Sequence, residues 1–440
     1  TPKTRLSYTS PEMCRLDSEK LAKIDSICQL AVQAHATPGC QVLIAKDGNI
    51  FYNKAFGHHT YKQTTPNKTS DIYDLASVTK ITATLPAIIK LYDSRKINLA
   101  APLSDYYPPL KETDKKDITV QEVLCHNAGL KTFLPLFTDA IDPKSLPRPL
   151  FTSKRTAHNT TRLKDRLYVN LNYRFKDSTV SNSPKPGYKY MEPGLYMFPA
   201  YQDTIRSCIL HSPLNPKKEY AYSDLGFILL KFAVEHVTEK SLDQYCQEEF
   251  YRKLGMYHTD FLAHKRLNKN NLVPSCVDKL YRKTELKGYV HDPVAALLGG
   301  IAGHAGLFST AEDLAKMMQL YLNGGTYGGE YYFSPETMAT FSCKNNLFPK
   351  NRRGLGFDKP EPDQTKINPV SKCLPLTSFG HTGFTGIMAW CDPDNKLLYL
   401  FLSNRTYPDE FNTKLSEMNI RTQIQDIIYQ ALEESKIRYN

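Results

Sequence analysis

Segments typical of β-strands lie near both ends of this 440-residue chain, and mainly helical segments lie between them. Gln41–Ile44 and Ile50–Tyr52 are rich in β-branched and aromatic residues, and Asp47-Gly48 between them favours a hairpin turn. Near the other end, Ile387–Cys391 and Lys396–Ser403 flank a turn-forming segment rich in Asp and Asn. We therefore predict one antiparallel sheet assembled from both ends of the chain.

Helical periodicity indicates which segments surround this sheet. Asp17–Ala36 places apolar side chains on one helical face, and Leu415–Leu432 closes the chain with a second helix. The other predicted helices are Ser77–Leu91, a helix capped by Thr119, Phe227–Val237, Leu242–Lys253 and a helix from a Ser309–Glu312 capping box to about Leu322. The pattern predicts an α/β fold in which the terminal helices flank the antiparallel sheet and a mostly helical subdomain is inserted.

Neither an internal repeat nor a Gly/Ser linker divides the sequence, so we expect a single catalytic unit over residues 1–440. Its α/β part would comprise residues 1–75 and 285–440, and its helical part residues 76–284. Within the helical part, residues 131–216 are rich in Pro, Tyr, Lys and Ser and show little periodicity. This long insertion is expected to border the active-site cleft, because long loops in enzymes usually form lids or binding walls.

Composition excludes several classes of protein. Hydrophobic residues make up 41% and charged residues 23% of the chain, as in globular proteins. The longest apolar runs are far shorter than the roughly 18 residues that cross a bilayer, so we expect no membrane span. The net charge of +11 is scattered and accompanies no nucleic-acid-binding motif, so we expect no nucleic acid partner. Gly299–Gly306 does not match a dinucleotide-binding motif, and none of the ten cysteines forms C-x-x-C.

Three short motifs carry the candidate chemistry: Ser77-Val78-Thr79-Lys80, Tyr222-Ser223-Asp224 and His381-Thr382-Gly383. Residues three apart on a helix face the same side, so the Lys80 amine can reach the Ser77 hydroxyl. Serine needs a base before it can act as a nucleophile. Lys80 could be that base, with a pKa depressed by burial, or a cation that favours the phenolate form of Tyr222.

Two backbone amides are candidates for stabilising an oxyanion. The N–H of Ser77 lies at a predicted helix start, and that of Phe384 follows His381-Thr382-Gly383 on a predicted edge strand, where Gly383 would let a substrate approach. A structural interpretation is also open for each motif: Ser77 as a helix cap, Tyr222 as a core residue and His381 as an ordinary strand-edge histidine. The order of the three motifs together favours catalysis.

These motifs resemble those of the penicillin-recognising serine hydrolases, which comprise class C β-lactamases, DD-carboxypeptidases and related esterases. The family order is S-x-x-K, then Y-x-N, then K-T-G or H-x-G. Residues 99–110, 118–130 and 303–310 also resemble family segments in the same order, and the resemblance runs from about Leu16 to the C-terminus. It implies a β-lactamase/transpeptidase-like fold and hydrolysis without a metal or other cofactor.

The resemblance also implies roles for individual residues. Ser77 would be the acylated nucleophile, Lys80 its proton partner, Tyr222 the general base, and His381 the basic position that binds a substrate carboxylate or orients the hydroxyl network. Thr382, Gly383, Phe384 and Asp224 would contact the substrate. Asp224 stands where Asn is usual and cannot donate a hydrogen bond, and His381 replaces Lys. Both departures favour an esterase or D-amino-acid peptidase over an efficient β-lactamase.

A closer resemblance rests on Val290-His291-Asp292 and Gly303–Leu307, which are similar to the β-lactamase-like domain found C-terminal to family 3 glycoside hydrolases in some Bacteroidetes proteins. It implies that a glycoside hydrolase domain precedes this chain. It also implies a periplasmic or otherwise extracytoplasmic location, with a small-molecule or peptidoglycan-derived substrate.

Two other functions compete with the serine hydrolase. A catalytically weak or silent domain could use the same cleft to hold peptidoglycan peptides, as the departures at Asp224 and His381 suggest. A metal-dependent activity would rest on the 12 histidines, including His58-His59. Since adjacent residues on a strand point apart and the sequence has no H-E-x-x-H, we expect no metal.

Overall fold

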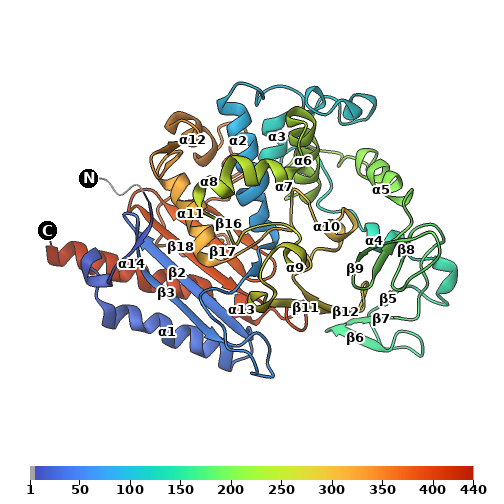
Figure 1. Ribbon diagram of the computed structural model, residues 1–440, viewed down its shortest axis with the longest axis horizontal. Coiled ribbons are helices and arrows are strands. Elements are labelled where there is room, and N and C mark those ends of the chain that lie inside the picture. The colour runs from blue at the N-terminus through green and yellow to red at the C-terminus, as the bar shows by residue number, and fades with distance from the viewer. Residues whose placement is uncertain (1–4, 440) are drawn as a thin grey trace.

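Six strands form the central sheet of the computed structural model, which describes residues 5–439. Their order is β1-β3-β2-β18-β17-β16, so the N-terminal hairpin pairs directly with the C-terminal strands (Figure 1). All pairs are antiparallel except β1 with β3. The strands are β1 (Ser7–Tyr8), β2 (Gly39–Lys46), β3 (Asn49–Gly57), β16 (Phe379–Gly383), β17 (Ile387–Asp392) and β18 (Leu397–Ser403). The prediction of one sheet built from both ends is confirmed.

Two terminal helices, α1 (Ser18–Gln33) and α14 (Ile420–Tyr439), cover one face of the sheet and run side by side (Figure 1). On β2, Val42 and Ile44 pack toward these helices, while Leu43 and Ala45 pack toward the opposite face. Because both faces are covered, the strand is apolar at four successive positions, 42–45, instead of alternating with polar residues.

The opposite face of the sheet carries the helices that hold the candidate site. A 3-10 turn at Ala76–Val78 and a π-helical segment at Lys80–Thr84 lead into α2 (Leu85–Asp93). Pro86 lies where the π-helical segment gives way to α-helix, so its missing N–H coincides with a change in the hydrogen-bonding pattern. The predicted helix Ser77–Leu91 is therefore present, but its first two turns are not α-helical.

The other helices lie partly in predicted segments, at residues 120–124, 224–238, 242–254, 311–322 and 414–417, and partly where no helix was predicted. They are α3 (Val120–Leu124), α4 (Leu136–Asp139), α5 (Tyr201–Leu210), α6 (Asp224–Thr238), α7 (Leu242–Cys246), α8 (Arg252–Leu254), α9 (Ala263–Arg266), α10 (Pro293–Leu297), α11 (Ala311–Leu322), α12 (Pro335–Ser342) and α13 (Lys414–Glu417). Thr119 forms the predicted cap of α3. The Ser309–Glu312 capping box is wrong by one residue, because Thr310 accepts the N–H of Asp313 at the start of α11.

The insertion at residues 131–216 contains more β-structure than its sequence indicated. Besides α4 and α5 it holds two three-stranded sheets, ordered β5-β7-β6 and β8-β10-β9. Their strands are β5 (Phe151–Thr152), β6 (Thr161–Lys164), β7 (Leu167–Val169), β8 (Val180–Ser181), β9 (Lys189–Glu192) and β10 (Leu195–Met197). Strands of two to four residues are too short to show periodicity. Over residues 5–439, no helix is both long and apolar enough to cross a membrane.

Three short strand pairs complete the structure. They involve β4 (Tyr73–Asp74) with β13 (Phe308–Ser309), β11 (Pro274–Asp278) with β12 (Thr284–Lys287), and β14 (Thr326–Tyr327) with β15 (Glu330–Tyr331). The pairing of β4 with β13 matters for the site, because it ties the segment before Ser77 to the glycine-rich segment 299–306 that precedes β13.

Candidate active site

Ser77 lies in a strained turn between β4 and the π-helical segment. The residue before it, Ala76, has φ 47°, in the left-handed region that residues with a Cβ rarely adopt. The N-cap position of this turn is occupied by Leu75 and not by Ser77, and no side chain caps the turn. The cap interpretation of Ser77 is therefore not supported, and the strain is of the kind found at functional sites.

Asp74 fixes this turn in place. Its carboxylate accepts the N–H of Ala76 at 2.8 Å and that of His291 at 2.7 Å, and its carbonyl accepts the Thr385 hydroxyl. Burial raises the pKa of Asp74 although both amides lower it. The residue joins the turn, the segment at His291 and the loop after β16. Sequence reasoning missed it, although an acidic residue at a strand end just before the serine was a visible signal.

Lys80 is fully buried and donates to three oxygens around it: Ser77 Oγ at 2.9 Å, Tyr222 Oη at 2.6 Å and Asp224 Oδ1 at 2.6 Å. Burial lowers the pKa of Lys80, but Asp224 and Tyr222 raise it by more, so its pKa is above the ordinary value. Of the two roles left open by the sequence, this favours the cation; a Lys80 base with a depressed pKa is wrong.

Tyr222 is enclosed by basic side chains. The His126 ring packs against it at 4.7 Å between centroids, and the Arg353 guanidinium lies 5.1 Å from its ring centre. Burial, with the nearby Arg353 and Lys80, lowers the pKa of His126 well below its ordinary value, so His126 is neutral. Its Nδ1 accepts the N–H of Ser223, which holds the Tyr222 segment in place. Neither His126 nor Arg353 was identified from sequence as part of the site.

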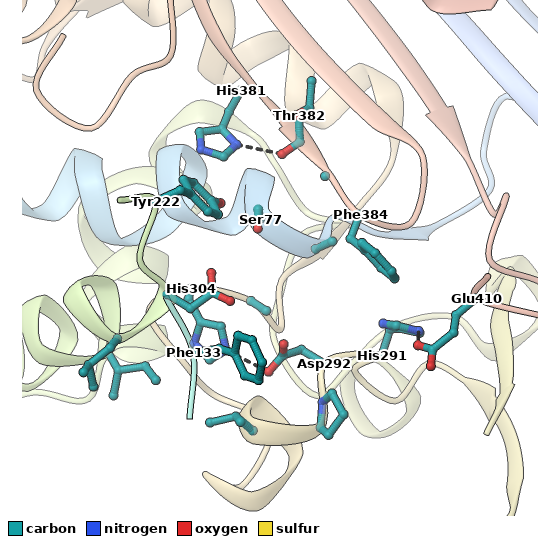
Figure 2. A pocket seen from close by; sticks show the side chains of 18 of the residues that line it. Ser77, Phe133, Tyr222, His291, Asp292, His304, His381, Thr382, Phe384 and Glu410 are labelled. Carbon is teal, nitrogen blue, oxygen red and sulfur yellow. Dashed lines mark hydrogen bonds and ion pairs between the residues drawn. The ribbon is translucent and has the colours of Figure 1, made fainter. Parts of the chain in front are cut away.

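His381 lies on β16, close to Tyr222, and Figure 2 shows it with Thr382 and Phe384 around Ser77. Its Nδ1 donates to the Thr382 carbonyl at 2.7 Å. Burial, followed by Arg353 and Lys80, lowers the pKa of His381 to about 3. His381 is therefore neutral at pH 7 and only 3% exposed. This disfavours a role as the cation that binds a carboxylate and leaves the orienting role.

Gly383 is required for a reason other than the one expected. A Cβ at this position would lie 2.6 Å from the Leu75 carbonyl oxygen and 3.4 Å from the Ala76 Cβ. The glycine thus lets β16 approach the turn that carries Ser77. Phe384 follows directly, and its ring is about half exposed.

A cavity of about 1030 Å³ brings the predicted residues together. Seven of the eight site residues predicted from the sequence line this cavity. The eighth, Lys80, is buried behind Ser77 and donates a hydrogen bond to its hydroxyl. The lining also includes residues 133–138 and Phe151, so the beginning of the insertion borders the cavity as predicted. Arg405 and Arg421 line it near Phe384; in the described part of the chain neither forms an ion pair, and both donate only to uncharged oxygens.

The wall of the cavity opposite β16 contains residues whose roles the sequence did not reveal. His304 Nε2 bonds to Asp292 Oδ1 at 2.7 Å, and His291 Nε2 lies 3.1 Å from Glu410 (Figure 2). Burial lowers the pKa of His291, but its hydrogen bonds to Cys276 and Glu410 raise it to about 10. One ligand atom each of Asp224, Asp292 and His304 lie within 4.8 Å of one another. By contrast, His59 is buried against Asp71 and lies outside this cavity.

An antiparallel sheet covered by helices, with a serine bonded to a buried lysine three residues later and that lysine bonded to a tyrosine, defines a serine hydrolase of the penicillin-recognising class. The family model described as Beta-lactamase matches residues 24–419. The chain belongs to this family, and the predicted resemblance is confirmed.

Individual proteins agree with this assignment. A protein of Salmonella gallinarum named "Putative D-alanyl-D-alanine carboxypeptidase" is 28% identical over 93% of this chain and 88% of its own length. EstCE1, described as a hydrolase with promiscuous acyltransferase activity, has a TM-score of 0.63 at 18% identity and covers 93% of this chain and 99% of its own. A class C β-lactamase has a TM-score of 0.59 at 15% identity, covering 93% and 96%. The two structures support the fold alone.

Proposed function

We propose that the chain hydrolyses an amide or ester through an acyl-enzyme on Ser77. The observation that carries this proposal is the Lys80 ammonium, which binds the Ser77 hydroxyl, the Tyr222 hydroxyl and Asp224 at the same time. Nucleophile and candidate base are thus each one hydrogen bond from a single buried cation.

In the proposed reaction, Ser77 Oγ attacks the substrate carbonyl carbon while its proton passes to the Tyr222 phenolate. The carbonyl oxygen becomes an oxyanion held by the N–H groups of Ser77 and Phe384, neither of which donates in the turn and loop hydrogen bonds of the described chain. Collapse of this intermediate breaks the bond to the leaving group, which takes the proton from Tyr222. Water then attacks the acyl-enzyme by the reverse proton path and releases the acid.

The substrate class follows from charge. A neutral His381 removes the cation that suits a β-lactam carboxylate, and Asp224 can accept but not donate a hydrogen bond. Arg405 and Arg421 offer an alternative place for a carboxylate on the same cavity. We therefore favour a D-amino-acid peptide or ester from the cell envelope over a β-lactam, consistent with the names of the curated relatives. An extracytoplasmic location and a preceding glycoside hydrolase domain remain proposals of the same kind.

The experiment is fluorophosphonate labelling of folded protein with peptide mapping, alongside rates for nitrocefin, a D-Ala-D-Ala peptide and short-chain nitrophenyl esters. We expect modification of Ser77, none in the Ser77→Ala variant, and faster turnover of the peptide or esters than of nitrocefin. An unlabelled Ser77 with no turnover of any substrate would leave the silent peptidoglycan-binding domain as the better account.

A further inference from the structure

Two carboxylates and a buried histidine form one wall of the catalytic cavity, which we call the acidic wall: Asp224, Asp292 and His304. One ligand atom of each lies within 4.8 Å of the others. Asp224 is bonded to Lys80, which is bonded to Ser77, so the acidic wall is two hydrogen bonds from the nucleophile. In Figure 2 Asp292 and His304 lie on the side of Ser77 opposite His381.

Each member of the acidic wall has a polar atom that no protein group uses. Asp224 engages Lys80 through Oδ1, and Asp292 engages His304 and the N–H of Ala295 through Oδ1; their second oxygens have no hydrogen-bond partner among residues 5–439. His304 is 2% exposed, and its Nδ1 is a buried atom without a partner in the described chain. The acidic wall therefore holds three polar atoms that a bound ligand could engage.

The charge and surroundings of the acidic wall favour a cationic donor. Burial raises the pKa of Asp292, but His304 and the N–H of Ala295 together lower it by more than burial raises it. The pKa of Asp292 is therefore below its ordinary value, and the carboxylate stays ionised. Phe133, whose side chain is 64% exposed, lines the same cavity. An exposed aromatic ring in that cavity can attract a cation.

Size and existing contacts distinguish an ammonium from a metal ion. An ammonium with N–H···O distances of about 2.8 Å holds its acceptors roughly 4.6 Å apart. One carboxylate oxygen of Asp224 lies within 4.8 Å of one of Asp292. A divalent metal at this group would need a His304 nitrogen as a ligand, but the His304 Nε2 already holds Asp292. An ammonium can use the second oxygens of Asp224 and Asp292 alone.

We propose that the acidic wall binds an ammonium group on the acyl part of the substrate, close to the scissile carbonyl. The substrate class is then an amino-acyl amide or ester with a free amine. The inference rests on the proposed function, in which Ser77 receives that acyl group, and adds the feature of the substrate that the cavity selects.

The test compares alanine p-nitroanilide, in both enantiomers, with its N-acetyl derivative at pH 6, where the free amine is protonated. We expect kcat/KM for the amine to exceed that for the acetylated substrate at least tenfold in the unmodified protein. Asp292→Asn, which keeps the capping oxygen for Ala295, should reduce this ratio at least tenfold. His304→Gln should reduce it in the same direction. Glu410→Gln removes a charge from the same cavity away from the acidic wall and should change the ratio less than twofold.

A binding measurement tests the inference without turnover. In Ser77→Ala protein, calorimetry should show alaninamide binding at least tenfold tighter than N-acetylalaninamide, and the Asp292→Asn change should abolish this difference. If the free-amine and acetylated compounds are turned over and bound equally well, the inference is overturned. It is also overturned if Glu410→Gln reduces the preference for the free amine as much as Asp292→Asn does. If adding EDTA removes that preference, a metal ion and not the acidic wall alone is responsible. Labelling of Ser77 without amine preference refutes the inference alone, whereas an unlabelled Ser77 refutes the proposed function and leaves calorimetry to decide.

Discussion

Replacing Asp224 with Asn tests whether this carboxylate holds the Lys80 charge inside the protein. The substitution keeps an acceptor oxygen at the 2.6 Å contact but removes the negative charge. Breaking a fully buried ion pair by removing one partner costs about 3–5 kcal/mol. The Asp224 side chain is 27% exposed and Tyr222 still accepts from Lys80, so water and hydrogen bonding offset part of this loss. We expect a decrease of about 1–3 kcal/mol in the free energy of unfolding.

The pH dependence of that decrease identifies its cause. Because the folded-state pKa of Lys80 is above its ordinary value, the stabilisation from Asp224 is fully present below that ordinary value and is lost as pH rises through the folded-state pKa. Denaturant unfolding should therefore give the same difference between the two proteins from pH 7 to pH 10, and a smaller one above. The matched control is Asp165→Asn, in an exposed pair with Arg162, which should cost less than about 0.5 kcal/mol. Equal stability of the Asp224→Asn and unmodified proteins at pH 7 would refute the reasoning.

Three further changes probe the rest of the site. Tyr222→Phe should lower kcat for ester hydrolysis by roughly 10²–10⁴-fold, and retention of activity would exclude Tyr222 as the base. Gly383→Ala places a Cβ 2.6 Å from the Leu75 carbonyl oxygen and should cost about 1–3 kcal/mol, measured by denaturant unfolding; an unchanged midpoint would contradict the close approach. Because the pKa of His381 falls from 6.5 to about 3 on folding, stability should rise with pH between those values, and His381→Gln should flatten that rise in acid titrations.

Composition and turn signals were sufficient to predict the central sheet, because its long strands contain apolar runs such as Ile50–Tyr52 and Leu397–Leu402 beside turn-forming residues. Gln41–Ile44 and Lys396–Ser403 proved to be neighbours in β2 and β18. The two small sheets of the insertion were not predicted, because strands such as Thr161–Lys164 are half exposed and carry no alternation strong enough to detect.

The candidate site was predictable where its chemistry lies on short motifs. Ser77, Lys80, Tyr222 and His381 belong to such motifs, and each borders the cavity or contacts a residue that does. The ionisation of these residues was not predictable, since it depends on partners distant in sequence. Lys80 owes its raised pKa to residues 142 and 144 positions away.

Residues that act through tertiary contacts alone gave no local signal. Asp74 binds the N–H of His291, 217 positions away, and Asp292 and His304 become a pair only when α10 and the glycine-rich segment fold together. A pattern read along one segment cannot show which distant atom will complete a hydrogen bond. Such residues become visible only from geometry.

The carboxylate at Asp224 bears on whether the site is active or silent. An acidic residue beside Lys80 could quench the cation on which Tyr222 depends, which would suit a binding domain. Yet Asp224 uses one oxygen for Lys80, the ammonium still reaches both hydroxyls, and the Lys80 pKa is raised and not lowered. A fully buried lysine without such a partner would tend to lose its proton and with it the charge that Tyr222 needs. Asp224 therefore preserves the charged state of Lys80 that the proposed mechanism requires, and its second oxygen remains available to the proposed substrate.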